Sequence, residues 1–145
     1  MKKTNLTLLI VIVSTIIFSG CVANSKDMII DNEQSLKLRS YQTKEYGKEK
    51  VIVARAVVST LQDLSFIIDK ADMPTGTVTA TKLVKGASMR MTIITREKNK
   101  TSTQVRANAQ FSSFNQMPET VTEPEVYQSF YTALDKAIFL ENAGL

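Results

Sequence analysis

The chain has 145 residues, enough for one domain of ordinary size and a targeting segment. It contains no histidine, which argues against histidine-ligated zinc sites, serine–histidine triads and cysteine–histidine pairs, because all of these need an imidazole. Its 18 Lys and Arg residues exceed the 14 Asp and Glu residues, but two of the 18 are Lys2 and Lys3 and the rest are interleaved with acids, so no nucleic-acid-binding tail is expected.

The N-terminal residues have the pattern of an export signal. Met1–Asn5 is a short basic segment, and Leu6–Phe18 is an uncharged run rich in Ile, Leu and Val. The length of this run suits the apolar core of a signal peptide and falls short of the about 20 apolar residues that a membrane-spanning helix needs. We therefore expect residues 1–20 to be a cleaved leader. An ordinary secretory leader with an incidental cysteine and an uncleaved anchor are the alternatives.

Small residues precede Cys21, the one cysteine of the chain. Ser19, Gly20 and Cys21 resemble the lipobox of bacterial lipoproteins, in which the cysteine receives a diacylglyceryl group, and Phe18 stands where that pattern usually has Leu. The resemblance implies signal-peptidase recognition through Phe18, Ser19 and Gly20, lipidation of Cys21 and firm anchoring, because two or more acyl chains give stable attachment. Val22 in place of Asp favours the outer membrane by resemblance to Gram-negative sorting, an argument that a Gram-positive source would remove.

Residues 21–35 are mostly small and polar and are expected to form a lipidated tether, with residues 36–145 as a single domain. Leu36–Tyr46 alternates between apolar and polar residues and predicts a strand. Lys48–Leu64 predicts an amphipathic helix. Its expected apolar stripe consists of Val51, Ala54, Val57, Val58, Leu61 and Leu64.

Two hairpins are predicted next. Ser65–Asp72 and Thr77–Val84 are strand-like and flank a turn that contains Pro74 and Gly76. Apolar and polar residues then alternate along 87–94 and again along 103–111, and both strands place their apolar set on one face.

The predicted register of the second hairpin follows from its turn. A three-residue loop at 98–100 would set Met91 opposite Ala107 and Ile93 opposite Val105.

Ser112–Val121 is expected to be a polar loop. Thr122 and Glu125 have the spacing of a capping box before a helix that runs to about Asn142. The apolar side of this helix should contain Tyr127, Phe130, Tyr131, Leu134, Ala137 and Ile138. The order β-α-β-β-β-β-α predicts an α+β two-layer sandwich, a mostly antiparallel sheet of about five strands with two helices on one face.

The mature chain also resembles a group of small proteobacterial lipoproteins of unknown function. The segments that carry this resemblance are Leu38–Thr43, Val58–Leu64, Ile68–Asp72 and Gly76–Lys82. The resemblance covers most of the mature chain and implies no activity. The layout is loosely similar to accessory lipoprotein domains of envelope assembly machines, a likeness of architecture alone.

The outward face of the predicted sheet is polar and mildly basic. It should display Arg90, Thr92, Arg96, Gln104, Arg106, Asn108 and Gln110, with Thr77, Thr79 and Thr81 nearby. Such a face can contact a partner protein, a glycan strand or lipid headgroups, but antiparallel sheets often leave one face simply solvated.

From these observations we expect a non-catalytic, membrane-anchored binding or envelope-assembly module on the periplasmic leaflet of the bacterial outer membrane. Its partners would be membrane lipid, through the N-terminal acyl chains, and an envelope protein, and no cofactor, metal or nucleic acid is expected. A carboxylate-based cell-wall hydrolase that uses Asp69 and Asp72 is one alternative, because a glycosidase needs two carboxyls about 5–10 Å apart in a cleft. A purely structural lipoprotein is the other.

Overall fold

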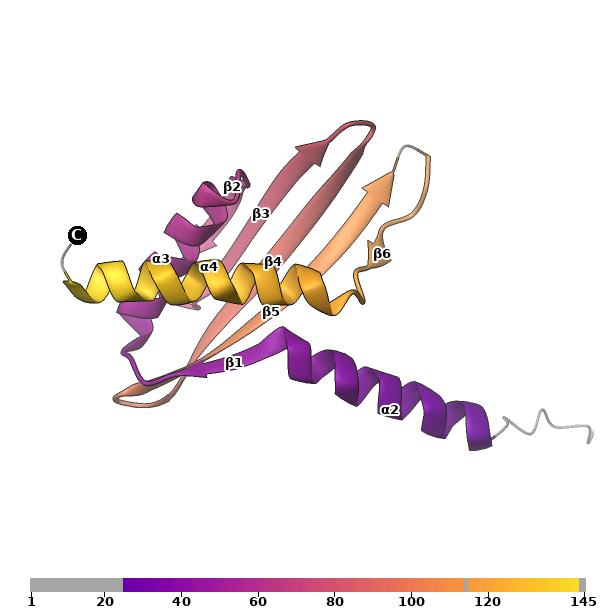
Figure 1. Ribbon diagram of the computed structural model, residues 1–145, viewed down its shortest axis with the longest axis horizontal. Coiled ribbons are helices and arrows are strands. Elements are labelled where there is room, and N and C mark those ends of the chain that lie inside the picture. Colours follow the sequence, from indigo (N-terminus) through magenta and orange to yellow (C-terminus); the bar gives the residue numbers. More distant parts are fainter. Residues whose placement is uncertain (1–24, 114, 144–145) are drawn as a thin grey trace, which may run out of the picture. The chain divides into compact units, whose positions relative to one another are not determined.

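The computed structural model (Figure 1) describes the backbone of residues 25–113 and 115–143, and the side chains of residues 33–113, 115–141 and 143. The chain divides into two compact units, residues 1–34 and residues 35–145. Helix α2 (Ser25–Gln42) begins in the first unit and ends in the second. It therefore includes part of the segment that was expected to be a tether.

The second unit is an α+β domain built on an antiparallel sheet, as the sequence predicts. The strands run in the order β1-β5-β4-β3-β2, and β6 also pairs with β5. The sheet has six strands rather than about five, because the short β6 lies in the predicted polar loop, and α2 adds a helix to the two predicted. The elements are β1 (Thr43–Tyr46), α3 (Lys50–Asp63), β2 (Ile67–Asp72), β3 (Thr77–Val84), β4 (Ala87–Asn99), β5 (Ser102–Ser113), β6 (Glu119–Thr120) and α4 (Pro124–Ala143).

The prediction of a strand over Leu36–Tyr46 is wrong for its first seven residues. These residues complete α2, and β1 begins only at Thr43. Leu38 and Tyr41, which are three apart, pack against the core, whereas Leu36 is 65% exposed. The contacts follow helical spacing, and the apparent alternation of leucines was coincidental.

The β2–β3 hairpin is confirmed, with β3 at its predicted bounds. A bulge between Ile68 and Lys70 interrupts the pairing of β2. The turn brings Gly76 to a φ of +75°, a conformation that favours glycine, and the Gly76 carbonyl accepts hydrogen bonds from the backbone N and the hydroxyl of Thr95 at 2.7 and 2.9 Å. The turn is thereby fixed to β4.

The β4–β5 hairpin forms as predicted, but its register differs by two residues from the expected one. Met91 pairs with Ala109 and Ile93 with Ala107. A shift of two residues keeps every side chain on its face, and Met91, Ile93, Val105, Ala107 and Ala109 are all buried on the helix side, as expected.

The turn of this hairpin explains the shift. Asn99 pairs with Ser102, which leaves a two-residue connection in place of the predicted three-residue loop, and a bulge follows Glu97. The side-chain oxygen of Asn99 accepts a hydrogen bond from the backbone N of Thr101 at 3.0 Å. Asparagine commonly tightens turns in this way.

Helices α3 and α4 cross the same face of the sheet (Figure 1). All six residues predicted for the apolar side of α4 are buried, and the rings of Phe130 and Tyr131 meet edge to face at 5.2 Å. The stripe of α3 is rotated from the predicted one: Val53 and Thr60 are buried, whereas Val51 in the first turn is 55% exposed.

The start of α4 differs in detail from the predicted capping box. The helix begins at Pro124, and the carbonyl of Glu123 accepts the backbone N of Val126 at 3.3 Å. The carboxylate of Glu123, not that of Glu125, accepts the backbone N of Thr122 at 3.0 Å. The cap therefore lies one residue later than predicted.

Candidate functional site

The predicted lipidation site, Cys21, and the predicted recognition residues Phe18, Ser19 and Gly20 lie outside the described residues. Within the described ranges, 25–113 and 115–143, no helix is long and apolar enough to cross a membrane. The same part of the chain has no group of three or more His, Cys, Asp or Glu side chains suited to a metal ion.

The predicted partner residues do come together on the sheet face opposite the core, which we call the polar sheet face. Cross-strand pairing places Thr79, Thr92 and Asn108 side by side on β3, β4 and β5. Arg96 pairs with Gln104 in another row. The face consists of Arg90, Thr92, Arg96, Gln104, Arg106 and Asn108, with Thr77, Thr79 and Thr81, and Ile94 lies among them because it pairs with both Thr77 and Arg106.

Hydrogen bonds order one side of this face. The Thr81 hydroxyl donates to the Asp69 carboxylate at 2.6 Å, and Nε of Arg90 lies 3.5 Å from the same hydroxyl oxygen. Nε of Arg106 is shielded from solvent and has no hydrogen-bond partner in the described part of the chain. Arg90 and Arg96 are exposed residues, and a guanidinium group has several N–H donors that could bind a partner's acceptors.

A pair of opposite charges lies at the β1 end of the face. Nζ of Lys98 donates to Glu45 at 2.8 Å, and the Ser102 hydroxyl donates to the same carboxylate at 2.7 Å. The hydrogen bond from Lys98 and that from Ser102 lower the pKa of Glu45. Both charged side chains are 48% exposed, so the pair adds little stability, but it neutralises this corner of the face.

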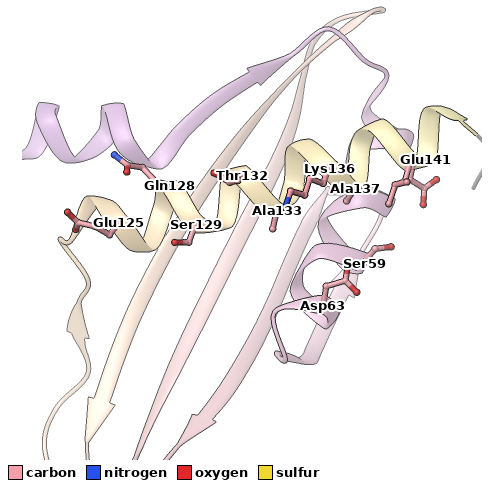
Figure 2. Close-up of a pocket in the computed structure, with 11 residues that line it drawn as sticks. Ser59, Asp63, Glu125, Gln128, Ser129, Thr132, Ala133, Lys136, Ala137 and Glu141 are labelled. Atoms are coloured by element: carbon pink, nitrogen blue, oxygen red, sulfur yellow. The ribbon is translucent and has the colours of Figure 1, made fainter.

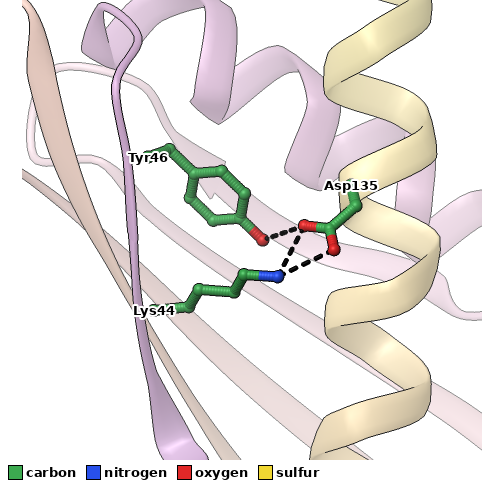
Figure 3. A network of polar contacts seen from close by, with 3 residues as sticks. All are labelled: Lys44, Tyr46 and Asp135. Carbon is green, nitrogen blue, oxygen red and sulfur yellow. Dashed lines mark hydrogen bonds and ion pairs between the residues drawn. The ribbon is translucent and has the colours of Figure 1, made fainter.

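A second polar network ties β1 to α4 on the helix side of the sheet (Figure 3). Nζ of Lys44 lies 2.8 and 2.7 Å from the two carboxylate oxygens of Asp135, and the Tyr46 hydroxyl donates to one of them at 3.0 Å. Burial, and then the hydrogen bond to Asp135, raise the pKa of Tyr46 far above its usual range. A phenol that holds its proton so tightly positions β1 and is a poor acid catalyst.

Two further tyrosines fix the junction between α2 and β1. The Tyr131 hydroxyl lies 2.6 Å from the carbonyl oxygen of Gln42, and burial raises its pKa. The Tyr127 hydroxyl donates to the Val121 carbonyl at 2.6 Å and accepts Nε2 of Gln42 at 3.2 Å. These groups satisfy one another inside the core, so they stabilise the fold.

Asp69 and Asp72, the carboxylates of the hydrolase alternative, each accept a hydrogen bond from a neighbouring residue. Asp69 lies in the β2 bulge and accepts the Thr81 hydroxyl. Asp72 accepts the backbone N of Thr75 at 3.0 Å, and this hydrogen bond lowers the pKa of Asp72. A general acid needs a raised pKa, so Asp72 is unsuited to that role and could serve only as the ionised member of a catalytic pair.

The sequence did not predict a cavity between α3 and α4 (Figure 2). Its volume is about 880 Å³, and its walls come from the last turns of α3 and from one side of α4. Small side chains, Ser129, Ala133 and Ala137, recur along that side of α4. Figure 2 also shows Asp63, Lys136 and Glu141 around the cavity.

Two smaller cavities, also missed, lie where the sheet extends past the helices. One has a volume of about 310 Å³ and is lined mainly by apolar side chains, including Phe66, Met89, Phe111 and Phe130. The other, about 330 Å³, shares Met89 and Phe111 with it. The length of β4 could have predicted them. Its 13 residues extend for about 44 Å, whereas two helices side by side cover about 20 Å, so part of the sheet must be left uncovered.

Comparisons with known proteins leave the function open. No protein-family profile matches the sequence, and no curated protein is significantly similar to it. The fold is distantly similar to the crystal structure of a DUF4468 family protein from Bacteroides ovatus, with a TM-score of 0.34 and 11% identity over 70% of this chain and 82% of that chain. A likeness this weak supports no conclusion about fold or function.

Proposed function

We propose that the mature protein is a lipid-anchored, non-catalytic binding or assembly module of the bacterial envelope. Acyl chains on Cys21 would hold it on the periplasmic leaflet of the outer membrane, and the polar sheet face would contact an envelope protein. In this proposal the domain is a two-layer sandwich, with α3 and α4 as one layer and the sheet as the other. The lipobox resemblance at Ser19, Gly20 and Cys21 supports the anchor.

The observation that carries the binding role is the difference between the two faces of the sheet. One face packs its alternate residues, such as Ile93 and Val105, against the helices. The other aligns arginine, amide and hydroxyl side chains in cross-strand rows, with Arg90 and Arg96 exposed. Arginine is enriched in protein interfaces, and a rigid sheet presents such donors without the entropic cost of ordering a loop.

The hydrolase alternative has less support, because the lowered pKa of Asp72 leaves only Asp69 for the general-acid role, and the Asp69 carboxylate already accepts the Thr81 hydroxyl. The purely structural alternative predicts that no stable partner exists. Crosslinking in cells distinguishes it from the binding module.

The anchor is tested by metabolic labelling with a radioactive or clickable fatty acid. The wild-type protein should incorporate the label and fractionate with outer membranes, and Cys21→Ser should do neither. Label on the Cys21→Ser variant, or an intact leader on the native protein, would refute the anchor.

The contact face is tested separately by in-cell crosslinking followed by mass spectrometry. Replacement of Arg90 and Arg96 by Glu should reduce recovery of the partner at least tenfold. The matched control replaces Lys37 and Arg55, two exposed cations outside this face, by Glu and should leave recovery unchanged. Equal recovery from the two double variants would show that the polar sheet face is merely solvated.

A further inference from the structure

The three cavities are linked by shared lining residues, and together we call them the helix–sheet cleft. Ser129 of α4 lines both the α3–α4 cavity and the apolar cavity below it. Val126, Met89 and Phe111 line both of the smaller cavities. The cleft therefore extends from the groove between the helices to the uncovered end of the sheet, on the side opposite the polar sheet face.

The floor of the cleft is apolar and partly open to solvent. Val84 is 43% exposed and Phe111 is 40% exposed, and both belong to strands that continue beyond the helices. Phe66 closes the inner end, with Nζ of Lys82 at 5.8 Å from its ring centre. Covering the exposed parts of Val84 and Phe111 would remove further apolar surface from water, which is favourable.

The rim of the cleft is acidic, although the chain as a whole has a net charge of +4. Five carboxylates stand around it against two lysines, and Nζ of Lys82 donates to the Leu64 carbonyl at 2.9 Å and so is turned toward the protein. The carboxylates are on exposed residues and the surrounding field favours a cationic partner. They are Asp63, Glu119, Glu123, Glu125 and Glu141.

The shape of the cleft favours a helical partner. Its lining follows α4 from Glu125 to Glu141, a distance of about 24 Å at about 1.5 Å per residue, which is the length of a short helix. Small side chains at Ser129 and Ala133 allow another helix to approach closely. Amphipathic helices are commonly bound in such grooves, with large apolar residues inserted into the floor.

We propose that the helix–sheet cleft binds an amphipathic helix of a partner protein, with its apolar side chains on Val84, Met89 and Phe111 and its flanking lysines or arginines against the acidic rim. An anionic lipid fits poorly, because its phosphate would meet the same carboxylates. This site is separate from the polar sheet face and depends neither on that face nor on lipidation of Cys21.

The test uses the full-length protein in detergent and a fluorescent helical peptide with leucines on one face and lysines on the other. Two comparison peptides replace every lysine by glutamate, or scramble the order so that no apolar face remains. Fluorescence anisotropy should show at least tenfold tighter binding of the lysine peptide than of either comparison. Equal binding of the lysine and glutamate peptides, or of the scrambled peptide, would overturn the proposal.

Variants of the cleft residues test where the lysine peptide binds. Replacement of Asp63 and Glu141 by Lys should weaken the lysine peptide at least tenfold, and both positions lie near helix C-termini, where lysine is favourable for folding. The matched control replaces Glu33 and Glu97, which are exposed and outside the cleft, and should bind as the wild type does. Phe111→Ala should also weaken binding at least tenfold, with an unchanged circular dichroism spectrum as the folding control.

Two further measurements exclude other occupants. Vesicles of phosphatidylglycerol should not displace the peptide, and displacement would assign the cleft to a membrane instead. Sedimentation of the protein alone should show a monomer. A dimer that the Asp63 and Glu141 replacements dissociate would assign the cleft to a second copy of the chain. Either result would overturn the proposal for the helix–sheet cleft, and neither would bear on the role of the polar sheet face.

Discussion

Gly76→Ala should be the most damaging single-methyl change in the β2–β3 turn. The backbone at Gly76 has a φ of +75°, which costs about 1–2 kcal/mol for a residue with a Cβ. The added methyl would also meet the carbonyl and hydroxyl oxygens of Thr95 at less than contact distance, and Lys50 Cε at 2.7 Å. Because Thr95 belongs to a central strand, the turn itself must move.

The movement would break the two hydrogen bonds from Thr95 to the Gly76 carbonyl. Each contributes about 1 kcal/mol, so the total loss is about 3–4 kcal/mol. This is a large fraction of the about 5–15 kcal/mol that stabilises a typical domain. Gly86 provides a matched control: its φ is +74°, but an added Cβ meets nothing within 4 Å. Gly86→Ala should therefore cost only the backbone term.

Urea unfolding followed by far-ultraviolet circular dichroism measures both variants, since the chain has no tryptophan to serve as a probe. The free energy of unfolding should fall by about 2 kcal/mol more for Gly76→Ala than for Gly86→Ala, the two lost hydrogen bonds being the difference. Equal losses would refute the close approach of the turn to Thr95.

Three further predictions concern the polar contacts of the core. Tyr127→Phe should lower the free energy of unfolding by about 1–3 kcal/mol, because it removes a hydroxyl that bonds a buried carbonyl and Gln42; no change would mean that these bonds are absent. Asp135→Asn should cost less than about 1 kcal/mol in the same assay, since the ion pair that it removes, between Asp135 and Lys44, is nearly half exposed; a larger loss would contradict this. Tyr46 and Tyr131 should ionise only together with unfolding, because burial raises the pKa of both; their contribution to stability is fully present below about pH 10 and is lost as the pH rises further. Early ionisation in an absorbance titration would argue against their burial.

The parts of the fold that the sequence predicts correctly are those with strong periodicity. The six apolar residues predicted for the inner side of α4 recur at helical spacing and are all buried, and the alternation in β3, β4 and β5 identifies their inner face. The predicted register of β4 and β5 was wrong because a shift of two residues preserves that alternation. Only the turn at Asn99 distinguishes the predicted pairing from the observed one. The strand predicted for residues 36–42 is wrong because Leu36 and Leu38 have the two-residue spacing that is typical of a strand, whereas these residues are helical.

The two candidate sites also differ in how far the sequence predicts them. The polar sheet face follows from alternation alone, and its residues do share one face, although their binding role remains a prediction. The helix–sheet cleft depends on where α3 crosses α4 and on how far β4 and β5 extend past both helices. Such crossing geometry is a property of tertiary packing, and no local pattern around Ser129 or Phe111 encodes it.

The bulge in β2 has a consequence for how this protein behaves when many copies are crowded together. β2 ends the sheet on one side, and an uninterrupted strand there, with Ile67 64% exposed, would be a template for the strand of a neighbouring molecule. The irregular pairing between Ile68 and Lys70, with charged side chains at and beside it, breaks the row of backbone donors and acceptors. Molecules at high concentration can thus stay separate, and this protection involves a single irregular position in the strand.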